Sequence, residues 1–297
     1  MKDLPILALI APCYNEEELA EKSCGILLDT LNNLINNGLV SENSYISIVD
    51  DGSRDNSWNI LSKIAENEKK VKLIKFMCNF GHQKALLAGM VENDADIYIT
   101  PDFDMQDDLS VIPQMIEKYK NNDIDIVYTV RNKRNVDSFI KNFLTRIYYG
   151  LNKFIDGNQI SNSADFRLVT KNVVEFLRKI NENNIYLRGL LKNLGFKYDI
   201  IYTERKERIA GVPKYTFIKM FELAMDGITN SNRPARLIFI PAVLCLLISI
   251  FKESSTFFVG SLNLFALTVL GEYITKIYTE TKNRPNYIVS NKINYDN

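Results

Sequence analysis

Short runs of β-branched and aromatic residues alternate with longer helical patterns along most of the chain. The predicted helices are 17–36, 56–66, 83–91 and 110–119, and the predicted strands are 6–10, 45–49, 72–76, 97–100, 124–130 and 196–202. This alternation is typical of an α/β fold in which a mostly parallel sheet is covered by helices on both faces. Since ligands of such sheets bind beyond the carboxyl ends of the strands, we expect the functional residues in the loops that follow strands.

The composition favours a globular chain without a general affinity for nucleic acid. With 297 residues and 46% apolar content, the chain can bury the core of one large domain and carry an appendage. Its 36 basic and 36 acidic residues balance, so phosphate recognition must come from locally placed arginines and lysines. The four cysteines show no metal-ligand spacing, which indicates reduced thiols facing the cytosol.

From residue 137 onward the chain has a different pattern. Residues 137–193 are predicted to be mainly helical, and 215–232 form an amphipathic helix. That helix either packs on the preceding domain or lies among lipid headgroups. Two nearly uncharged runs within 233–278 then predict a membrane hairpin, although each is shorter than the ~20 residues that comfortably span a bilayer. A re-entrant hairpin and a buried core hairpin are the alternatives.

The basic residues that flank the predicted hairpin place both of its ends on the cytoplasmic side. The predicted organisation is therefore a catalytic domain over 1–214, the amphipathic helix, the hairpin, and a cytoplasmic tail over 279–297. This arrangement places the protein at the cell membrane, with the catalytic domain in the cytoplasm. The sequence does not decide whether the chain forms a homo-oligomer.

Acidic residues follow the predicted strand 97–100 at alternate positions. Asp102 and Asp104 can point the same way if the segment is extended, and Gln106 continues the alternation. Two adjacent carboxylates repel each other, and a hard divalent cation that also binds diphosphate oxygens removes this conflict. A D-x-D pattern at the end of a parallel strand therefore predicts a site for a hard divalent cation.

Three more motifs follow predicted strands. Residues 11–17 contain a proline-stiffened turn, 49–55 contain a carboxylate and a turn glycine, and 79–84 open a helix after Gly81. The first two motifs can equally serve as turns and helix caps. His82 is the only histidine, and without a recognisable partner in the sequence it is not assigned a role as a base.

Taken in order, the motifs P-x-Y-N-E, D-D-G-S-x-D, N-F-G-H-Q, D-x-D-x-Q-D, S-x-D-F-R and R-x-x-G-x-x-K-Y resemble those of family 2 glycosyltransferases. Within that family the chain is most similar to the polyisoprenyl-phosphate glycosyltransferases, over residues 4–289. The resemblance implies a GT-A fold and an inverting transfer of a hexose-type sugar. The implied partners are a nucleotide-sugar donor, polyprenyl (undecaprenyl) phosphate and the lipid membrane.

The resemblance also implies roles for individual residues. The implied ligands of Mg²⁺ or Mn²⁺ are Asp102, Asp104 and Gln106, and the implied catalytic residues are Asp165, Arg208 and Lys214. The implied nucleotide-binding residues are Pro12, Tyr14, Glu16, Asp51, Asp102 and Arg131. The chain departs from the family pattern at Pro213, before the loop lysine, and at Asp108, where a proline is usual.

Two other functions fit the motifs. One is a family 2 enzyme that glycosylates a saccharide, although the Q-x-x-R-W motif of processive members is absent because Trp58 is the only tryptophan. The other is a non-catalytic scaffold that binds nucleotide at a membrane.

Because a phosphate acceptor is already an anion, the predicted transfer does not need a strong general base, and we expect Asp165 to orient rather than to abstract a proton.

Overall fold

The computed structural model describes residues 4–131, 163–180, 182, 187–203 and 284–295, together with isolated residues between 259 and 282. The chain divides into two compact units. The first unit contains residues 1–133, 162–212 and 285–297, and it holds every described strand. The second unit contains residues 134–161 and 213–284.

The first unit is built on an eight-stranded sheet with the order β7-β5-β6-β4-β1-β2-β3-β8. Strands β6 and β8 run antiparallel to their neighbours, and the other pairs are parallel. The bounds are β1 (Leu7–Cys13), β2 (Tyr45–Asp50), β3 (Val71–Phe76), β4 (Ile97–Ile99), β5 (Ile126–Arg131), β6 (Ser163–Thr170), β7 (Tyr198–Thr203) and β8 (Val289–Ile293).

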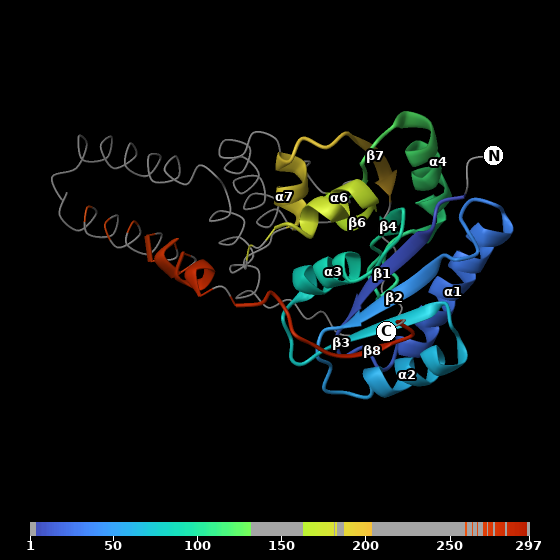
Figure 1. The fold of residues 1–297 in the computed structure, drawn as a ribbon, viewed down its shortest axis with the longest axis horizontal. Coiled ribbons are helices and arrows are strands. Elements are labelled where there is room, and N and C mark those ends of the chain that lie inside the picture. The colour runs from blue at the N-terminus through green and yellow to red at the C-terminus, as the bar shows by residue number, and fades with distance from the viewer. Residues whose placement is uncertain are drawn as a thin grey trace, which may run out of the picture. The chain divides into compact units, whose positions relative to one another are not determined.

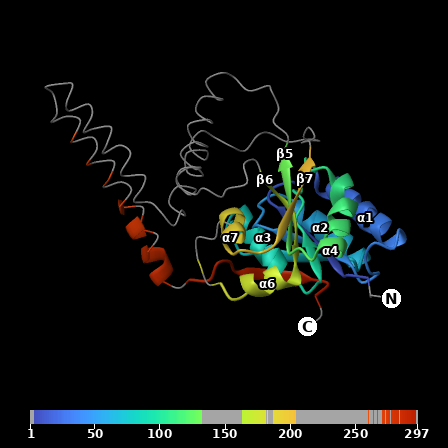
Figure 2. The ribbon, with the colours of Figure 1, turned by 90° about the horizontal axis from the view of Figure 1, so that it is seen from above.

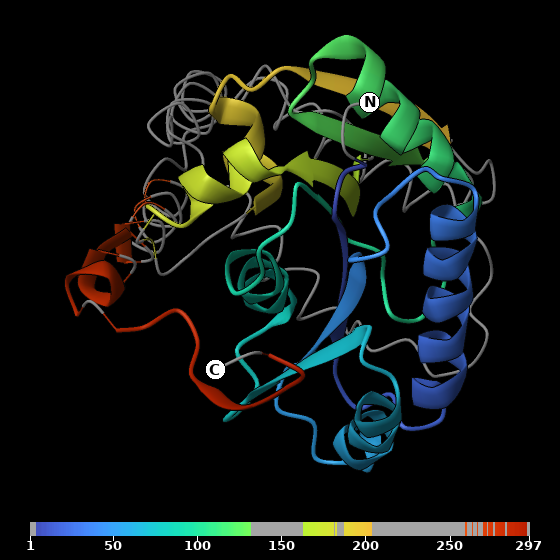
Figure 3. The same ribbon diagram turned by 45° about the vertical axis from the view of Figure 1, so that its right-hand side comes forward.

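Helices cover both faces of the sheet, as the sequence predicts. Figure 3 shows α1, α2 and α4 on one face and α3 and α6 on the other, and the view from above in Figure 2 agrees. The bounds are α1 (Ala20–Asn36), α2 (Ser57–Asn67), α3 (His82–Val91), the short η1 (Leu109–Val111), α4 (Ile112–Asn122), α6 (Lys171–Leu177) and α7 (Leu187–Asn193).

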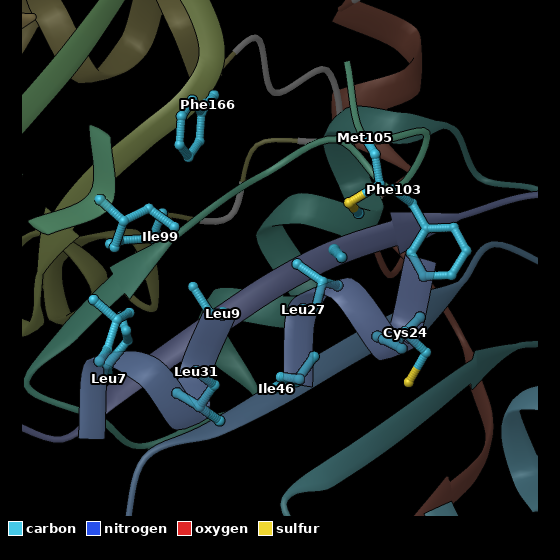
Figure 4. Packing of buried hydrophobic residues seen from close by; sticks show 14 of the residues in the cluster. Leu7, Leu9, Cys24, Leu27, Leu31, Ile46, Ile99, Phe103, Met105 and Phe166 are labelled. Atoms are coloured by element: carbon cyan, nitrogen blue, oxygen red, sulfur yellow. The ribbon is translucent and has the colours of Figure 1, made fainter. Parts of the chain in front are cut away.

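The main core lies between the sheet and α1. Alternate residues of β1, among them Leu7 and Leu9, pack with Leu27 and Leu31 of α1, all fully buried (Figure 4). Helix α1 presents this apolar stripe because its leucines recur at the spacing of one helix face. A smaller core on the opposite face packs Ala85 and Ala88 of α3 against the sheet. Burial on both faces fixes the positions at which the strands end.

Strand β1 extends further than predicted, to Cys13. The sequence predicts a turn at Pro12, but this residue is buried in the strand and pairs with Val49 of β2. A proline has no N–H to donate to a neighbouring strand. The position tolerates it because β4 pairs with β1 only as far as Leu9, so that ladder needs no donor at Pro12.

The prediction that 137–193 is mainly helical is wrong over β6. This strand lies between β4 and β5, and seven of its eight residues are buried. Polar and apolar residues alternate over 163–168, as expected of a strand, but this run is short and lies within a longer range that we interpreted as helical. The short helices α6 and α7 in the same range agree with the prediction, whereas 132–162 lies outside the described residues.

The segment predicted as a tail returns to the sheet. Strand β8 pairs antiparallel with β3 (Figure 1), which the prediction of a cytoplasmic tail over 279–297 missed. Before the strand, the Tyr287 ring stacks on Phe76 at 5.1 Å between centroids, and its hydroxyl donates a 2.7 Å hydrogen bond to Glu92. Strand β8 thereby covers the edge of β3, where unpaired backbone groups would otherwise be available to another chain.

The described residues between 259 and 282 are helical. Across the described part of the chain, no helix is both long enough and apolar enough to cross a membrane. The predicted amphipathic helix at 215–232 lies outside the described residues, as does most of the predicted hairpin, so both stay predictions.

The first prediction concerns Gly52, which has φ +70°. A Cβ atom there would lie 2.4 Å from the backbone carbonyl carbon of Cys78, because the loop after β2 approaches the end of β3. Gly38 has φ +64° but has no atom within 4 Å of such a Cβ. We expect Gly52→Ala to lower the free energy of unfolding by at least ~2 kcal/mol more than Gly38→Ala does. Urea unfolding measures the difference, and equal losses would show that the close approach is wrong.

Candidate active site

Hydrogen bonds join the loop that follows β1 to the loop that follows β2. The Asn15 amide donates to Ser53 Oγ at 2.9 Å, and the Arg54 amide donates to Asn15 Oδ1 at 2.8 Å. The Glu16 amide donates to Ser57 Oγ at 2.9 Å in the same way. The motifs at 11–17 and 49–55 therefore form one rigid surface, which presents Tyr14 and Glu16 half-buried.

Asp51 fixes a third loop to this surface. Its buried carboxylate accepts hydrogen bonds from the backbone amides of Phe80, at 2.7 Å, and Gly81, at 2.9 Å. Gly81 has φ +99°, a conformation that favours glycine, and α3 begins at the next residue. In the structure, Asp51 thus positions the start of α3, a role that the sequence does not predict; the predicted nucleotide contact stays a prediction.

The D-x-D segment after β4 is a turn and not the extended segment that we expected. The Met105 amide donates to the Asp102 carbonyl, and the Asp102 amide donates to the Asp107 carboxylate at 2.9 Å. The expected alternation nevertheless holds, because Phe103 and Met105 are buried in the main core (Figure 4) while Asp102 and Asp104 are partly exposed. The turn is thus anchored by its apolar residues.

Gln106 and Asp108, which follow the D-x-D turn, differ from its aspartates in burial and in hydrogen bonding. Gln106, which we predicted to be a metal ligand together with Asp102 and Asp104, is buried, with 7% of its surface exposed, whereas the two aspartates are partly exposed. Asp108, which stands where the family pattern has proline, accepts hydrogen bonds from the amide and the hydroxyl of Ser110 at the start of η1. This departure from the family pattern is therefore a helix cap.

The carboxylates of this turn can bind a divalent cation if substrate phosphates and water complete its coordination. Among the described residues, no three histidines, cysteines or acidic residues are grouped as a complete metal site. Asp102 and Asp104 provide carboxylate oxygens, the ligand type that Mg²⁺ and Mn²⁺ prefer. Mg²⁺ is commonly bound by one or two carboxylates and completed by water and substrate phosphates, so the residues present fit that mode of binding.

Asp165, near the start of β6, is held by two arginines. Its carboxylate is paired with Arg167, and it accepts hydrogen bonds from Arg188 at 3.1 Å and from Gln83 at 3.2 Å. Burial opposes ionisation, but the guanidinium groups of Arg188 and Arg167 outweigh it and hold the pKa of Asp165 well below its usual range. A carboxylate with so low a pKa is a poor proton acceptor at neutral pH, in agreement with the orienting role that we expect for Asp165.

The His82 side chain lies close to both the D-x-D turn and β6. Its Nε2 atom lies 3.8 Å from Asp102 Oδ1 and 3.8 Å from Asp165 Oδ2, and its side chain is 42% exposed. The sequence analysis assigned His82 no role because its acidic neighbours are distant in the sequence. The signal that could have identified it is the position of 79–84 directly after β3, at the same edge of the sheet as the D-x-D turn.

Three predicted site residues are not placed by the structure. Arg131 ends β5, but its side chain lies outside the described part of the chain. Arg208 and Lys214 fall wholly outside it. The structure therefore brings together Asp51, Asp102 and Asp165 through His82 and the loop before it, and the roles of the three basic residues stay predictions.

Comparison with known proteins identifies the sequence family. The model of the family described as glycosyl transferase family 2 matches residues 8–178, which is more than half of the chain. An uncharacterized glycosyltransferase of Bacillus subtilis, YkoT, is 38% identical over 96% of this chain and 91% of its own length. A prophage bactoprenol glucosyl transferase homolog of Escherichia coli is 33% identical over 95% of this chain and 98% of its own length.

Solved structures share the fold at low sequence identity. The mannosyltransferase PcManGT of Pyrobaculum calidifontis, solved with GDP-Man and Mn²⁺, is 14% identical with a TM-score of 0.50, covering 95% of this chain and 85% of its own. The mannosyl-3-phosphoglycerate synthase of Rubrobacter xylanophilus is 12% identical with a TM-score of 0.51, covering 75% and 71%. These likenesses confirm the predicted GT-A-like arrangement of sheet and helices.

The second prediction concerns the pH dependence of stability. Burial raises the pKa of Asp51 to about 6, and this outweighs the two amide hydrogen bonds, which favour the ionised form. The folded state therefore binds more protons than the unfolded state between pH ~4 and ~6, and stability falls as the pH rises through this window. We expect the urea midpoint of Asp51→Asn to fall less steeply than that of the wild type between pH 4 and 6.5. Parallel slopes would contradict this assignment.

Proposed function

The chain belongs to glycosyl transferase family 2, and from that membership we propose that it transfers a hexose-type sugar from a nucleotide diphosphate to undecaprenyl phosphate, with inversion at the anomeric carbon. The observation that carries the proposal is the grouping of Asp102, His82 and Asp165 at the carboxyl edge of the sheet. Relatives named bactoprenol glucosyl transferases, 31–33% identical over nearly the whole chain, support a polyprenyl phosphate acceptor.

The proposed donor site is formed by the rigid surface after β1 and β2 and by the D-x-D turn. Tyr14 and Glu16 bind the nucleoside, and Asp102 and Asp104 hold Mg²⁺ or Mn²⁺ against the diphosphate. When bound, such a cation stabilises negative charge on the departing nucleoside diphosphate. The anchoring of this turn by Phe103 and Met105 supports the proposal, because a preorganised carboxylate pair does not have to rearrange during the reaction.

The proposed acceptor site lies on the side of Asp165. An acceptor phosphomonoester is largely deprotonated at neutral pH and attacks the anomeric carbon as an anion. The depressed pKa of Asp165, caused by Arg188 and Arg167, supports a role in orienting groups rather than in taking up a proton. In this proposal Arg208 and Lys214 neutralise the acceptor phosphate, and Arg131 contacts the donor diphosphate.

The second unit is proposed to attach the enzyme to the membrane, with its catalytic domain in the cytoplasm. Large apolar side chains of the described helical residues are 48% to 65% exposed: Val259, Leu270, Ile274, Ile277 and Tyr278. Such a concentration of exposed apolar groups among the described residues of this range is typical of membrane or protein contact surfaces. This supports lipid contact at the C-terminal end of the predicted hairpin.

The third prediction tests the proposed metal site. Asp104→Asn keeps the shape of the side chain but removes one negative charge, so we expect sugar transfer to fall at least ~100-fold, with little change in stability. Asp108→Asn is the matched control, because asparagine also caps helices and Asp108, which accepts hydrogen bonds from Ser110, is not among the proposed metal ligands. Equal activity of the two variants would contradict metal binding by the D-x-D turn.

The assay for both variants also tests the proposed function itself. Detergent-solubilised protein is incubated with radiolabelled UDP- or GDP-sugars and undecaprenyl phosphate, with Mn²⁺ or with a chelator. Transfer of label to the organic phase only in the presence of the cation is the expected result. Label that reaches a soluble saccharide instead would identify a different acceptor class, and binding of nucleotide without any transfer would identify a scaffold.

A further inference from the structure

The position of the His82 ring is fixed from the backbone. The amides of Phe80 and Gly81, directly before it, are both held by the buried Asp51 carboxylate. His82 is then the first residue of α3, whose next turns pack into the sheet through Ala85 and Ala88. The imidazole therefore projects from a rigid base, although the side chain itself is 42% exposed.

The distance between His82 and Asp165 allows one oxygen atom beside them to bond to both. At 3.8 Å, Nε2 and Asp165 Oδ2 are too far apart for a direct hydrogen bond. An oxygen atom placed about 2.8 Å from each of them makes two hydrogen bonds that meet at close to a right angle. The separation thus suits a ligand oxygen that pairs with both groups at once.

The chemistry of the two groups limits what that oxygen belongs to. Asp165 is held in its ionised form by Arg167 and Arg188, so its carboxylate only accepts hydrogen bonds. A deprotonated phosphate oxygen has no hydrogen to donate to Asp165 Oδ2, so it cannot bond to both groups at this position, although Arg167 and Arg188 offset the charge of the carboxylate. A hydroxyl both donates and accepts, so it can donate to Asp165 and pair with the imidazole in either tautomer.

We propose that His82 is a specificity-determining residue that binds one hydroxyl group of the transferred sugar, which it shares with Asp165. The proposal rests on the proposed function. It identifies a hydroxyl group of the sugar as the part of the substrate that His82 and Asp165 recognise. The closeness of Asp102 supports it, because a sugar joined to a diphosphate at the D-x-D turn would have its ring beside His82. Gln83, which donates to the same Asp165 oxygen, holds the carboxylate in place.

The fourth prediction compares deoxy donors in three proteins. The wild type, His82→Phe and His82→Gln are each assayed with the nucleotide sugar that the wild type uses and with its 2-, 3-, 4- and 6-deoxy analogues. Phenylalanine keeps a ring of similar size without a hydrogen-bonding atom, and glutamine keeps a hydrogen-bonding group. We expect the wild type to discriminate against one analogue by about 10- to 100-fold in kcat/KM. His82→Phe should abolish discrimination at that position alone, and His82→Gln should restore part of it.

A purely structural role gives a different pattern. If His82 only maintains the loop, His82→Phe lowers kcat/KM for the parent sugar and for every analogue by the same factor, and the unchanged ratios overturn the proposal. The dissociation constant of the free nucleoside diphosphate should change by less than about twofold, because the base and phosphates are bound elsewhere. If the wild type transfers no sugar from any donor, the proposed function fails and the His82 proposal fails with it.

Discussion

The site depends on the reversed direction of β6. This strand enters the sheet between β4 and β5 and runs antiparallel to both. Its first residues therefore lie beside the end of β4, and the Thr100 hydroxyl donates to the Asp165 carbonyl across this junction. Were β6 parallel to its neighbours, Asp165 would lie at the opposite edge of the sheet from the D-x-D turn. One reversal in an otherwise parallel region thus brings the two predicted carboxylate motifs together.

Charge at this junction is balanced within the protein. The Asp165 carboxylate is paired with the guanidinium groups of two arginines. Burial of a carboxylate without such partners would raise its pKa instead of lowering it. The imidazole of His82 lies 3.8 Å from both Asp165 and Asp102 of the D-x-D turn. The Asp51 carboxylate, one loop away, places that imidazole by holding backbone amides. The site is therefore preorganised by polar contacts that involve the loops and not by the sheet alone.

The sequence predicts the fold well where strands and helices have distinct periodicity. Helices α1 to α4 and strands β1 to β5 and β7 were expected within a few residues, and the D-x-D and S-x-D-F-R motifs were expected to be functional. Strand β6 was missed although its polar and apolar residues alternate over 163–168, because this run is short and lies within a range interpreted as helical. Its polar residues Ser163 and Arg167 are buried as well, which the sequence does not indicate. The role of His82 was missed for a different reason, since its neighbours Asp102 and Asp165 approach it only through the strand order.

The C-terminal strand was missed because its pairing with β3 joins residues more than two hundred positions apart. Polar contacts add to the stacking of Tyr287 on Phe76: Tyr295 bonds to Ser47 and Asn93, and the Asn294 amide donates to three backbone carbonyls. In chain order, the segment that includes the predicted membrane hairpin lies between β7 and β8, two strands of the same sheet.

A crystal structure of the protein with Mn²⁺ and a non-hydrolysable analogue of its nucleotide sugar tests the central claim most directly. The account predicts an ion bound by the D-x-D turn and by diphosphate oxygens, with the sugar ring lying between Asp102 and Asp165 and against His82. An ion or a sugar bound at any other edge of the sheet, with Asp102 and Asp165 not in contact with the ligand, would contradict it.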